Sequence, residues 1–259
     1  MNFMEVLLSC MSSSPMGIVI RTNIESDITL VNQCSNDCTS TTYTEKGYRI
    51  RLINSSDRGL SKSRNMAIKN ATADICLICD DDEILYNNYA SLIESAFEEN
   101  PDTDLIAFAL DYSDKKYPRK RIKIDYLNAL KISSVQIAFR RNSILKNNIF
   151  FDERLGAGTG NGAGEEQKFL YDCLKAGLNI IFLPIYIGKV IDNSPSSWFR
   201  GYTQEYFFNR GWVHKILFGL FFACVYNIYF SITKYKLYKS NVSYFTSITS
   251  MFKGTFSKK

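Results

Sequence analysis

A run of five apolar residues at positions 75–79, followed by the acids Asp80, Asp81, Asp82 and Glu83, constrains the fold more than any other part of the chain. A continuous apolar run of this length is typical of a strand buried on both faces, as in a parallel sheet covered by helices. Neighbouring carboxylates repel one another. A fold that keeps four of them at the end of a buried strand is therefore expected to bind a positively charged group there.

The rest of the first 200 residues alternates between strand patterns and helix patterns. Strands are expected in six further segments: 5–10, 27–34, 48–56, 104–110, 135–141 and 179–184. Three helices are expected, one with Ser61 as its N-cap, one stopped by Pro101, and one that begins near residue 164 with Gly177 as its C-cap. Residues 18–24 fit either a helix or a strand. This alternation predicts an α/β domain with a mainly parallel central sheet.

Polar side chains stand at the ends of three predicted strands. Ser9 ends the first strand, Asn32 and Gln33 end the second, and Asp80 begins the acid cluster. The carboxyl ends of parallel strands meet at one edge of a sheet, where ligands bind. We therefore expect these residues to line a common ligand site.

Asp80 and Asp82 are carboxylates separated by one residue at a strand end. Mg²⁺ and Mn²⁺ prefer oxygen ligands and bridge to phosphates, so the pair is a candidate metal site that would stabilise charge on a departing diphosphate. The alternative is a solvated acidic turn that precedes the next helix. The acids alone leave both interpretations open.

The segment RGLSKSRNMAIKNATADICLICDDD at 58–82 resembles the donor-site half of family 2 glycosyltransferases. Gly59, the Ser-Arg-Asn at 63–65, the Ala-x-x-Asp at 71–74 and the D-x-D at 80–82 stand as in the family pattern. The resemblance covers roughly residues 5–200. It implies a GT-A fold, in which a nucleotide-binding α/β sandwich lies beside an acceptor-binding half.

A second segment, GAGEEQKFLYDCLKAGLNIIFLP, is similar to the later motif of the same family, which usually has Glu-Asp at a helix start. The resemblance implies that Glu166 deprotonates the acceptor hydroxyl, with Glu165 as the second choice. It also implies direct displacement with inversion at the anomeric carbon. The alternative is that both acids only favour the helix dipole. The glycine-rich residues 156–164 are expected to form a mobile lid.

The resemblance also implies a binding site for a nucleotide-sugar, built from several segments. The expected contacts are Ser9, Met11, Asn32, Gln33, Ser61, Arg64, Asp80 and Asp81. Among them, Asn32 and Gln33 are expected to read the edge of uracil. Arg64 is alternatively a surface cation of its helix.

The C-terminal part has a different composition. Residues 216–232 are apolar apart from Asn227 and a serine, and KYKLYK follows. Seventeen residues are at the lower limit for a membrane span, which needs roughly 20. The segment is either a membrane-surface helix or the helix that closes the acceptor side. We expect a glycosyltransferase domain at 1–205, with its donor half at about 1–112 and its acceptor half at about 113–205, and a helical tail at 206–259.

Three other features carry weaker expectations. His214 is an alternative metal ligand, and the basic segment 115–123 fits either a phosphate or membrane contact or a solvated loop. QEYFFNRGW at 204–212 has five residues, not two, between its Gln and Arg210, so a processive polymerase of the Q-x-x-R-W type is not expected, although Arg210 is a candidate diphosphate contact.

Composition bounds the cellular setting. The net charge of +5 does not indicate nucleic acid as a partner. The cysteines are odd in number and several lie in apolar runs, which predicts reduced thiols; they are Cys10, Cys34, Cys38, Cys76, Cys79, Cys173 and Cys224. The N-terminus has no basic leader. We expect a cytoplasmic protein, with contact to the inner face of the membrane left open.

Together the two motifs predict an inverting glycosyltransferase of the hexosyl or N-acetylhexosaminyl type that depends on Mn²⁺ or Mg²⁺. The expected donor is a UDP-sugar, and the expected acceptor is a hydroxyl of a glycan or lipid-linked oligosaccharide in bacterial surface polysaccharide or capsule synthesis. One alternative is a nucleotidyltransferase, whose usual glycine-rich, basic N-terminal signature the chain lacks. Another is a sugar-nucleotide-binding scaffold without catalysis, against which the intact acids argue.

Overall fold

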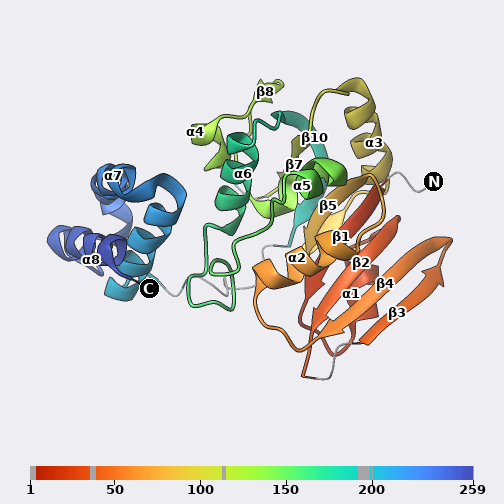
Figure 1. The fold of residues 1–259 in the computed structure, drawn as a ribbon, viewed down its shortest axis with the longest axis horizontal. Helices are drawn as coiled ribbons and strands as arrows, with labels where there is room; N and C mark the ends of the chain where they lie inside the picture. The colour runs from red at the N-terminus through yellow and green to blue at the C-terminus, as the bar shows by residue number, and fades with distance from the viewer. Residues whose placement is uncertain (1–3, 36–38, 113–114, 192–198, 200, 259) are drawn as a thin grey trace.

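The chain folds around one central sheet with helices on both of its faces (Figure 1). The computed structural model describes residues 4–35, 39–112, 115–191, 199 and 201–258. The strands are β1 (Met4–Cys10), β2 (Asp27–Gln33), β3 (Thr39–Glu45), β4 (Tyr48–Ser55), β5 (Ile75–Asp80), β6 (Glu83–Leu85), β7 (Leu105–Asp111), β8 (Ile122–Lys123), β9 (Ile137–Arg140) and β10 (Ile180–Val190).

The sheet has ten strands in the order β3-β4-β2-β1-β5-β9-β7-β10-β6, and β8 pairs with β10. Strands β4, β2, β1 and β5 are parallel neighbours, as are β7 and β10. The antiparallel strand β9 separates these two groups. Because β9 is antiparallel to both β5 and β7, six of the ten strands run in one direction. The predicted α/β fold with a mainly parallel sheet is confirmed.

The helices before residue 200 divide between the two faces of the sheet, and two longer C-terminal helices follow. They are α1 (Pro15–Arg21), α2 (Leu60–Asn70), α3 (Tyr89–Glu99), α4 (Tyr126–Ala129), α5 (Arg141–Lys146), α6 (Glu165–Lys175), α7 (Gln204–Tyr238) and α8 (Tyr244–Phe256), with a 3₁₀ turn at Ser134–Gln136. Apolar residues of α2, α5 and α6 pack in one core, and those of α1 and α3 pack in the other. Successive strand residues point to opposite faces, so Leu7 belongs to the first core while Val6 and Leu8 belong to the second.

Three local expectations differ from the structure. Residues 18–24, left open between helix and strand, contain the end of α1. Thr39–Glu45 forms an edge strand that was not predicted, because every residue in it is exposed and it lacks an apolar alternation. The N-cap of α2 is Gly59, at φ 123°, rather than Ser61, which is a residue of the helix itself. The backbone conformation of Gly59 is one that side-chain-bearing residues rarely adopt.

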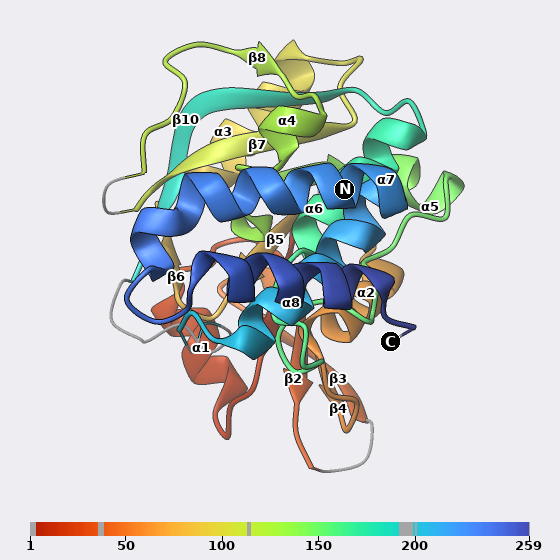
Figure 2. The same ribbon diagram turned by 90° about the vertical axis from the view of Figure 1, so that its left-hand side faces the viewer.

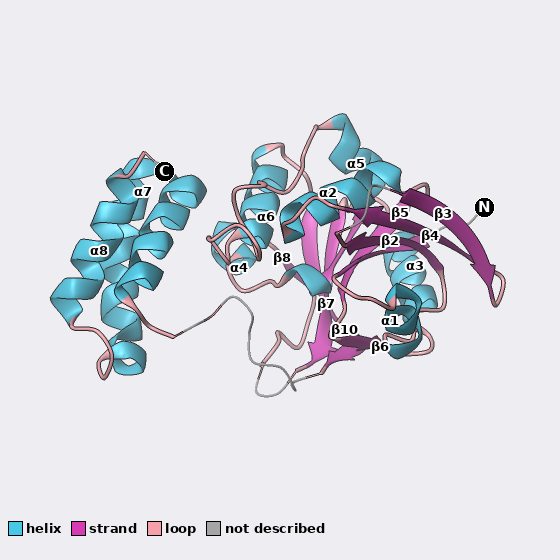
Figure 3. Cartoon of the chain, turned by 90° about the horizontal axis from the view of Figure 1, so that it is seen from below, coloured by secondary structure: helices cyan, strands magenta, loops and turns pink. Residues whose placement is uncertain are grey.

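Helices α7 and α8 form a separate layer at one end of the molecule (Figures 2 and 3). Non-helical angles at Gly219 (φ 75°, ψ 171°) divide α7 into a first part at 204–218 and a second part at 220–238. The first part contributes Trp212, Val213 and Leu217 to the core that contains α6. The expected boundary at residue 205 coincides with the first turn of α7, and the division into two domains stays a prediction.

Candidate active site

The carboxyl ends of the central strands bring the predicted strand-end residues together. Ser9 on β1 lies opposite Asp80 on β5, and Cys10 lies opposite Asn32 on β2. Asn32 in turn lies opposite Asn54 on β4. One edge of the sheet therefore holds the acid cluster and both polar strand ends.

Asn32 and Gln33 hold the loops at this edge. The amide of Asn32 accepts from Ser12 N at 2.9 Å and donates to Asn54 Oδ1 at 3.0 Å, and Asn32 is buried. Gln33 Oε1 accepts from Gly59 N at 2.9 Å, immediately before α2. Both amides thus fix the backbone around the site. Their contact with a nucleobase stays a prediction, as do those of the buried Ser9 and the exposed Met11.

Arg64 is the centre of the site. Its side chain is 2% exposed, and its Nη2 donates to both carboxylate oxygens of Asp80 at 2.9 Å and to Ser134 Oγ at 2.8 Å. Its Nη1 lies 3.6 Å from Glu165 Oε1. The guanidinium also lies over the ring of Phe151, 5.4 Å from the ring centroid. Arg64 is therefore a buried cation that connects the D-x-D motif with the acid pair on α6, and it is not a surface residue.

Burial and mutual repulsion raise the pKa values of Asp81, Asp82 and Glu83. Loss of solvent is the largest cause for Asp81 and Asp82, and the charge of Asp80 adds to it. Glu83 is 1% exposed, and burial raises the pKa of its carboxyl well above the ordinary value. Arg21, whose guanidinium donates to the carbonyl of Asp81, opposes the shift at Asp81 and Asp82. These three carboxyls therefore hold their protons more readily than free carboxylic acids do.

The D-x-D carboxylates fit a hard divalent cation in their chemistry. The side chain of Asp82 is exposed after the strand end, and its pKa is raised first by partial loss of solvent at the carboxyl and then by the charges of Asp80 and Asp81, so a cation would relieve the repulsion. Among the described residues, no group of three acidic, His or Cys side chains is placed to hold a metal ion. A cation at Asp80 and Asp82 would therefore need further oxygens from a bound diphosphate.

Glu165 and Glu166 form the first turn of α6, as predicted. Burial is the main cause that raises the pKa of Glu165 to about 8; the charge of Glu166 adds to it and Arg64 opposes it. The helix begins after Gly164, at φ 102°, where a Cβ would lie 2.6 Å from Val213 Cγ1. A glycine is required there for both reasons. The contact between Gly164 and α7 thus sets the position of the acid pair.

A second cation near the acid pair comes from the basic segment 115–123. Lys115 Nζ donates to Gln136 Oε1 at 2.6 Å and lies 5.4 Å from the ring centroid of Tyr117. Burial lowers the pKa of Lys115, whereas the charge of Glu166 opposes that shift. At least this lysine of the segment therefore points inward, towards the acid pair. Neither Lys115 nor Ser134 could be recognised as a site residue from sequence, because their neighbours are distant in the chain.

The glycine-rich loop is tied to the start of α2. Leu60 N donates to Ala157 O at 3.0 Å, and Ser61 Oγ donates to Leu155 O at 2.6 Å. Ser61 is fully buried, so its hydroxyl serves this contact; its role in nucleotide binding stays a prediction. A bridge between Gly156 and Asn161 closes the loop on itself. The loop is anchored at its base, and its expected mobility is untested.

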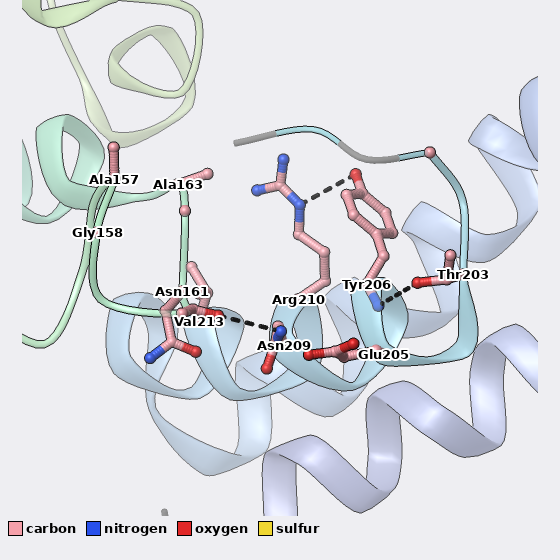
Figure 4. Close-up of a pocket in the computed structure, with 13 residues that line it drawn as sticks. Ala157, Gly158, Asn161, Ala163, Thr203, Glu205, Tyr206, Asn209, Arg210 and Val213 are labelled. Carbon is pink, nitrogen blue, oxygen red and sulfur yellow. Dashed lines mark hydrogen bonds between the residues drawn. The ribbon is translucent and has the colours of Figure 1, made fainter. Parts of the chain in front are cut away.

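A cavity of about 410 Å³ lies between this loop and the first turns of α7 (Figure 4). Its lining includes Ala157, Gly158 and residues 160–163 from the loop, the N-cap Thr203, and Tyr206 and Arg210 from α7. Arg210 Nε donates to Tyr206 Oη at 3.1 Å, and Figure 4 shows the guanidinium between the loop and the tyrosine ring. The cavity is close to the acid pair, because Val213 in its wall touches Gly164.

His214 lies outside this arrangement. It is buried in the helical layer, where Nδ1 lies 2.7 Å from Asn227 Oδ1, and burial lowers its pKa to about 3. Within the described residues its ring contacts aromatic side chains and Asn227 rather than acids, so a metal-ligand role has no support. The six described cysteines are free thiols, whereas Cys38 lies outside the described residues.

These features define a class of protein: an α/β enzyme of GT-A architecture with a D-x-D cluster and a second acid pair joined through one arginine. Residues 11–160, more than half of the chain, match the model of glycosyl transferase family 2. The chain therefore belongs to this family, and the expected family, fold and glycosyltransferase class are confirmed.

Solved structures with the same fold include S. aureus TarS. The chain matches TarS residues 1–349 with a TM-score of 0.63 at 13% identity, covering 99% of this chain and 81% of that one. The TarS 1–349 complex with UDP-GlcNAc matches with a TM-score of 0.63 at 14% identity, covering 98% and 82%. The complex with UDP matches with a TM-score of 0.60 at 15% identity, covering 94% and 76%. No curated protein matches the sequence.

Proposed function

We propose that this glycosyltransferase transfers a sugar from a UDP-sugar to an acceptor hydroxyl, with inversion at the anomeric carbon. The observation that carries the proposal is the pair of contacts from Arg64 to Asp80 and Glu165, which joins the donor motif to the acid pair. The crystal structures of TarS with UDP-GlcNAc and UDP, which share the fold, support UDP as the nucleotide.

Glu166 is the general base in this proposal. It follows Glu165 on α6, and one of its carboxylate oxygens is buried without a hydrogen-bond partner among the described residues. An acceptor hydroxyl can supply that missing partner as a donor. Glu165 is less suited to the role, because it is buried beside Arg64 and its raised pKa favours the protonated form near neutral pH. Its task is to hold the first turn of α6 against Arg64.

Asp80 and Asp82 would hold a Mn²⁺ or Mg²⁺ ion together with the donor diphosphate. When bound, the ion would neutralise charge on the departing diphosphate. Two residues of the chain have the other roles in the reaction. Arg64 holds Asp80 in place, and Glu166 takes the proton of the acceptor hydroxyl. The acceptor would enter beside the glycine-rich loop, where the cavity lined by Arg210 and Tyr206 lies.

The acceptor in this proposal is a hydroxyl of a glycan or a lipid-linked oligosaccharide in surface polysaccharide or capsule synthesis. The enzyme would work in the cytoplasm, with residues 206–259 in contact with the inner face of the cell membrane. The apolar, lysine-containing sequence of that segment supports the membrane contact.

Release of UDP from a panel of UDP-sugars tests this function. With Mn²⁺ present, the wild-type protein is expected to hydrolyse at least one UDP-sugar slowly and to transfer it faster to an acceptor. Glu166→Gln is expected to lower the transfer rate by about 10²–10⁴-fold while UDP binding is retained. A Glu166→Gln protein that transfers at the wild-type rate would refute the assignment of the base. No turnover of any UDP-sugar would favour the non-catalytic scaffold.

A further inference from the structure

The positive charge of the protein is concentrated in its helical layer. Residues 206–259 contain eight Lys and Arg residues and no Asp or Glu. The whole chain has 31 basic and 26 acidic residues, so residues 1–205 have 23 basic and 26 acidic ones, a net charge of −3. The helical layer therefore carries +8 on a protein whose remainder is slightly acidic.

The same layer exposes an apolar face. α7 is the one helix in the described part of the chain that is long and apolar enough to cross a membrane, and only 22% of its most apolar window is buried. Its second part exposes Phe221 (74%), Val225 (54%), Ile228 (43%) and Ile232 (60%). These residues follow the i, i+4, i+7, i+11 spacing of one helix face. Soluble monomers rarely expose a continuous apolar face of this kind without a partner.

The face opposite this one is buried and partly polar. Asn227 and Ser231 of the second part of α7 are fully buried. Asn227 lies 2.7 Å from His214 in the first part and donates to Thr255 of α8 at 2.8 Å. This polar chain holds the three helical segments together. A span surrounded by lipid would have to expose Asn227 and Ser231 to hydrocarbon, at a high cost in free energy.

The helical segments also pack too closely to separate easily. A Cβ on Gly211 would lie 1.9 Å from Met251 O, and one on Gly254 would lie 1.9 Å from Phe208 O. The first part of α7 and α8 thus cross at two glycines. The second part of α7 and α8 lie side by side (Figure 2), at the end of the molecule away from the sheet (Figure 3). The exposed apolar face belongs to this end.

We propose that the second part of α7 lies in the plane of an anionic membrane surface, with its apolar face in the lipid and without crossing it. On the same helix face, Lys236 lies one turn and the C-cap Lys239 two turns beyond Ile232, and their ammonium groups can reach anionic headgroups. A second copy of the chain is a poorer occupant, because a symmetric contact would bring two layers of charge +8 together. A lipid surface supplies both the apolar phase and the negative charge.

This mode of membrane binding adds a partner to the proposed function. The biological purpose of the binding rests on that proposed function. The first part of α7 lines the cavity beside the glycine-rich loop, so the layer that binds lipid also forms one wall of the expected acceptor site. An acceptor carried on a lipid anchor could then reach this cavity from the membrane surface.

Vesicle flotation of the full-length protein tests the surface. The protein is expected to float with vesicles of phosphatidylcholine and phosphatidylglycerol and to bind phosphatidylcholine alone much more weakly. Lys236→Gln/Lys239→Gln should lower the partition coefficient about 30-fold, from about fivefold per lysine, and Phe221→Ser/Ile232→Ser by tenfold or more, as a rough estimate. Tyr43→Ser, at an exposed site on β3, is the control and should change nothing.

Quenching by brominated lipids distinguishes an in-plane helix from a spanning one. Phe222→Trp and Tyr229→Trp place reporters about 10 Å apart along the helix. The wild-type protein gives the background of the native tryptophans, and Tyr43→Trp gives the signal of a reporter outside the lipid. Equal depth for both reporters is expected, whereas clearly different depths would mean that the helix crosses the bilayer. Absence of flotation, or a dimer that Phe221→Ser dissociates, would also overturn the proposal. UDP binding, measured on the same protein without vesicles, tests the proposed function separately.

Discussion

Nη2 of Arg64 lies 2.9 Å from both carboxylate oxygens of Asp80, although Arg64 is on a helix and Asp80 ends a strand. The arginine is buried, and in the described part of the chain it forms an ion pair with one further acid, Glu165. The two sequence motifs of the family are therefore linked by one cation. The integrity of the site depends on this contact.

Arg64→Met removes the cation and leaves Asp80 and Glu165 without their partner. The loss of one partner from a buried ion pair costs about 3–5 kcal/mol, so the free energy of unfolding should fall by about that amount. Arg154→Met is the control, because its salt bridge with Asp152 joins an arginine that is 63% exposed to a carboxylate that is 14% exposed and should cost at most about 1 kcal/mol. Urea unfolding of both variants measures the difference. Equal losses of unfolding free energy in the two variants would show that the buried contacts of Arg64 stabilise the fold no more than an exposed salt bridge does.

Glu165 predicts a pH dependence of stability. Its pKa in the folded protein is about 8, above the ordinary 4.5, mainly because it is buried. Between these values the folded state holds a proton that the unfolded state has released, so stability is fully present below about pH 4.5 and is lost as the pH rises through 8. The contribution is at most about 1.4 kcal/mol per pH unit.

Glu165→Gln isolates this contribution, because glutamine keeps the shape and does not titrate. The decrease in unfolding free energy between pH 5 and pH 8 should be smaller in the variant than in the wild-type protein. Denaturant unfolding at several pH values gives both curves. Curves of equal slope would mean that Glu165 is already ionised at neutral pH in the folded protein.

Gly164→Ala tests whether the contact with α7 positions the acid pair. The new Cβ would lie 2.6 Å from Val213 Cγ1, at a backbone φ of 102°. Gly177→Ala is the matched control, because Gly177 also has a positive φ, 78°, but its Cβ would meet open space. Overpacking should make Gly164→Ala at least about 1 kcal/mol more costly than the control. It should also lower kcat, while Gly177→Ala leaves kcat unchanged; equal effects in both assays would contradict the account.

Much of the fold could be predicted from local patterns in the sequence. The apolar runs at β1, β2, β5 and β7 and the acids at the start of α6 were sufficient to predict an α/β enzyme with its site at the strand ends. The edge strand β3 escaped prediction, because an exposed antiparallel edge needs no apolar residues. The insertion of β9 between β5 and β7 also could not be predicted, because strand pairing is decided by packing between distant segments.

The residues of the candidate site were likewise predicted only in part. The acids Asp80, Asp82, Glu165 and Glu166 were identified from the motifs, but the partners of Arg64 were not. Ser134 is 70 residues away from Arg64 in the chain, and only the packing of α2 against the sheet brings them together. Ser61 was interpreted as a helix cap by residue type, whereas the conformation of Gly59 ends the loop one residue before α2 begins.

Calorimetric titration with UDP, GDP and CMP, each with and without Mn²⁺, tests the central claim most directly. The wild-type protein is expected to bind UDP in a Mn²⁺-dependent manner and more tightly than the other nucleotides. Asp82→Asn should abolish the Mn²⁺-dependent part of the binding without loss of folding, because Asp82 is exposed. Absence of binding to every nucleotide under both conditions would contradict the account and leave the acid cluster with a structural role.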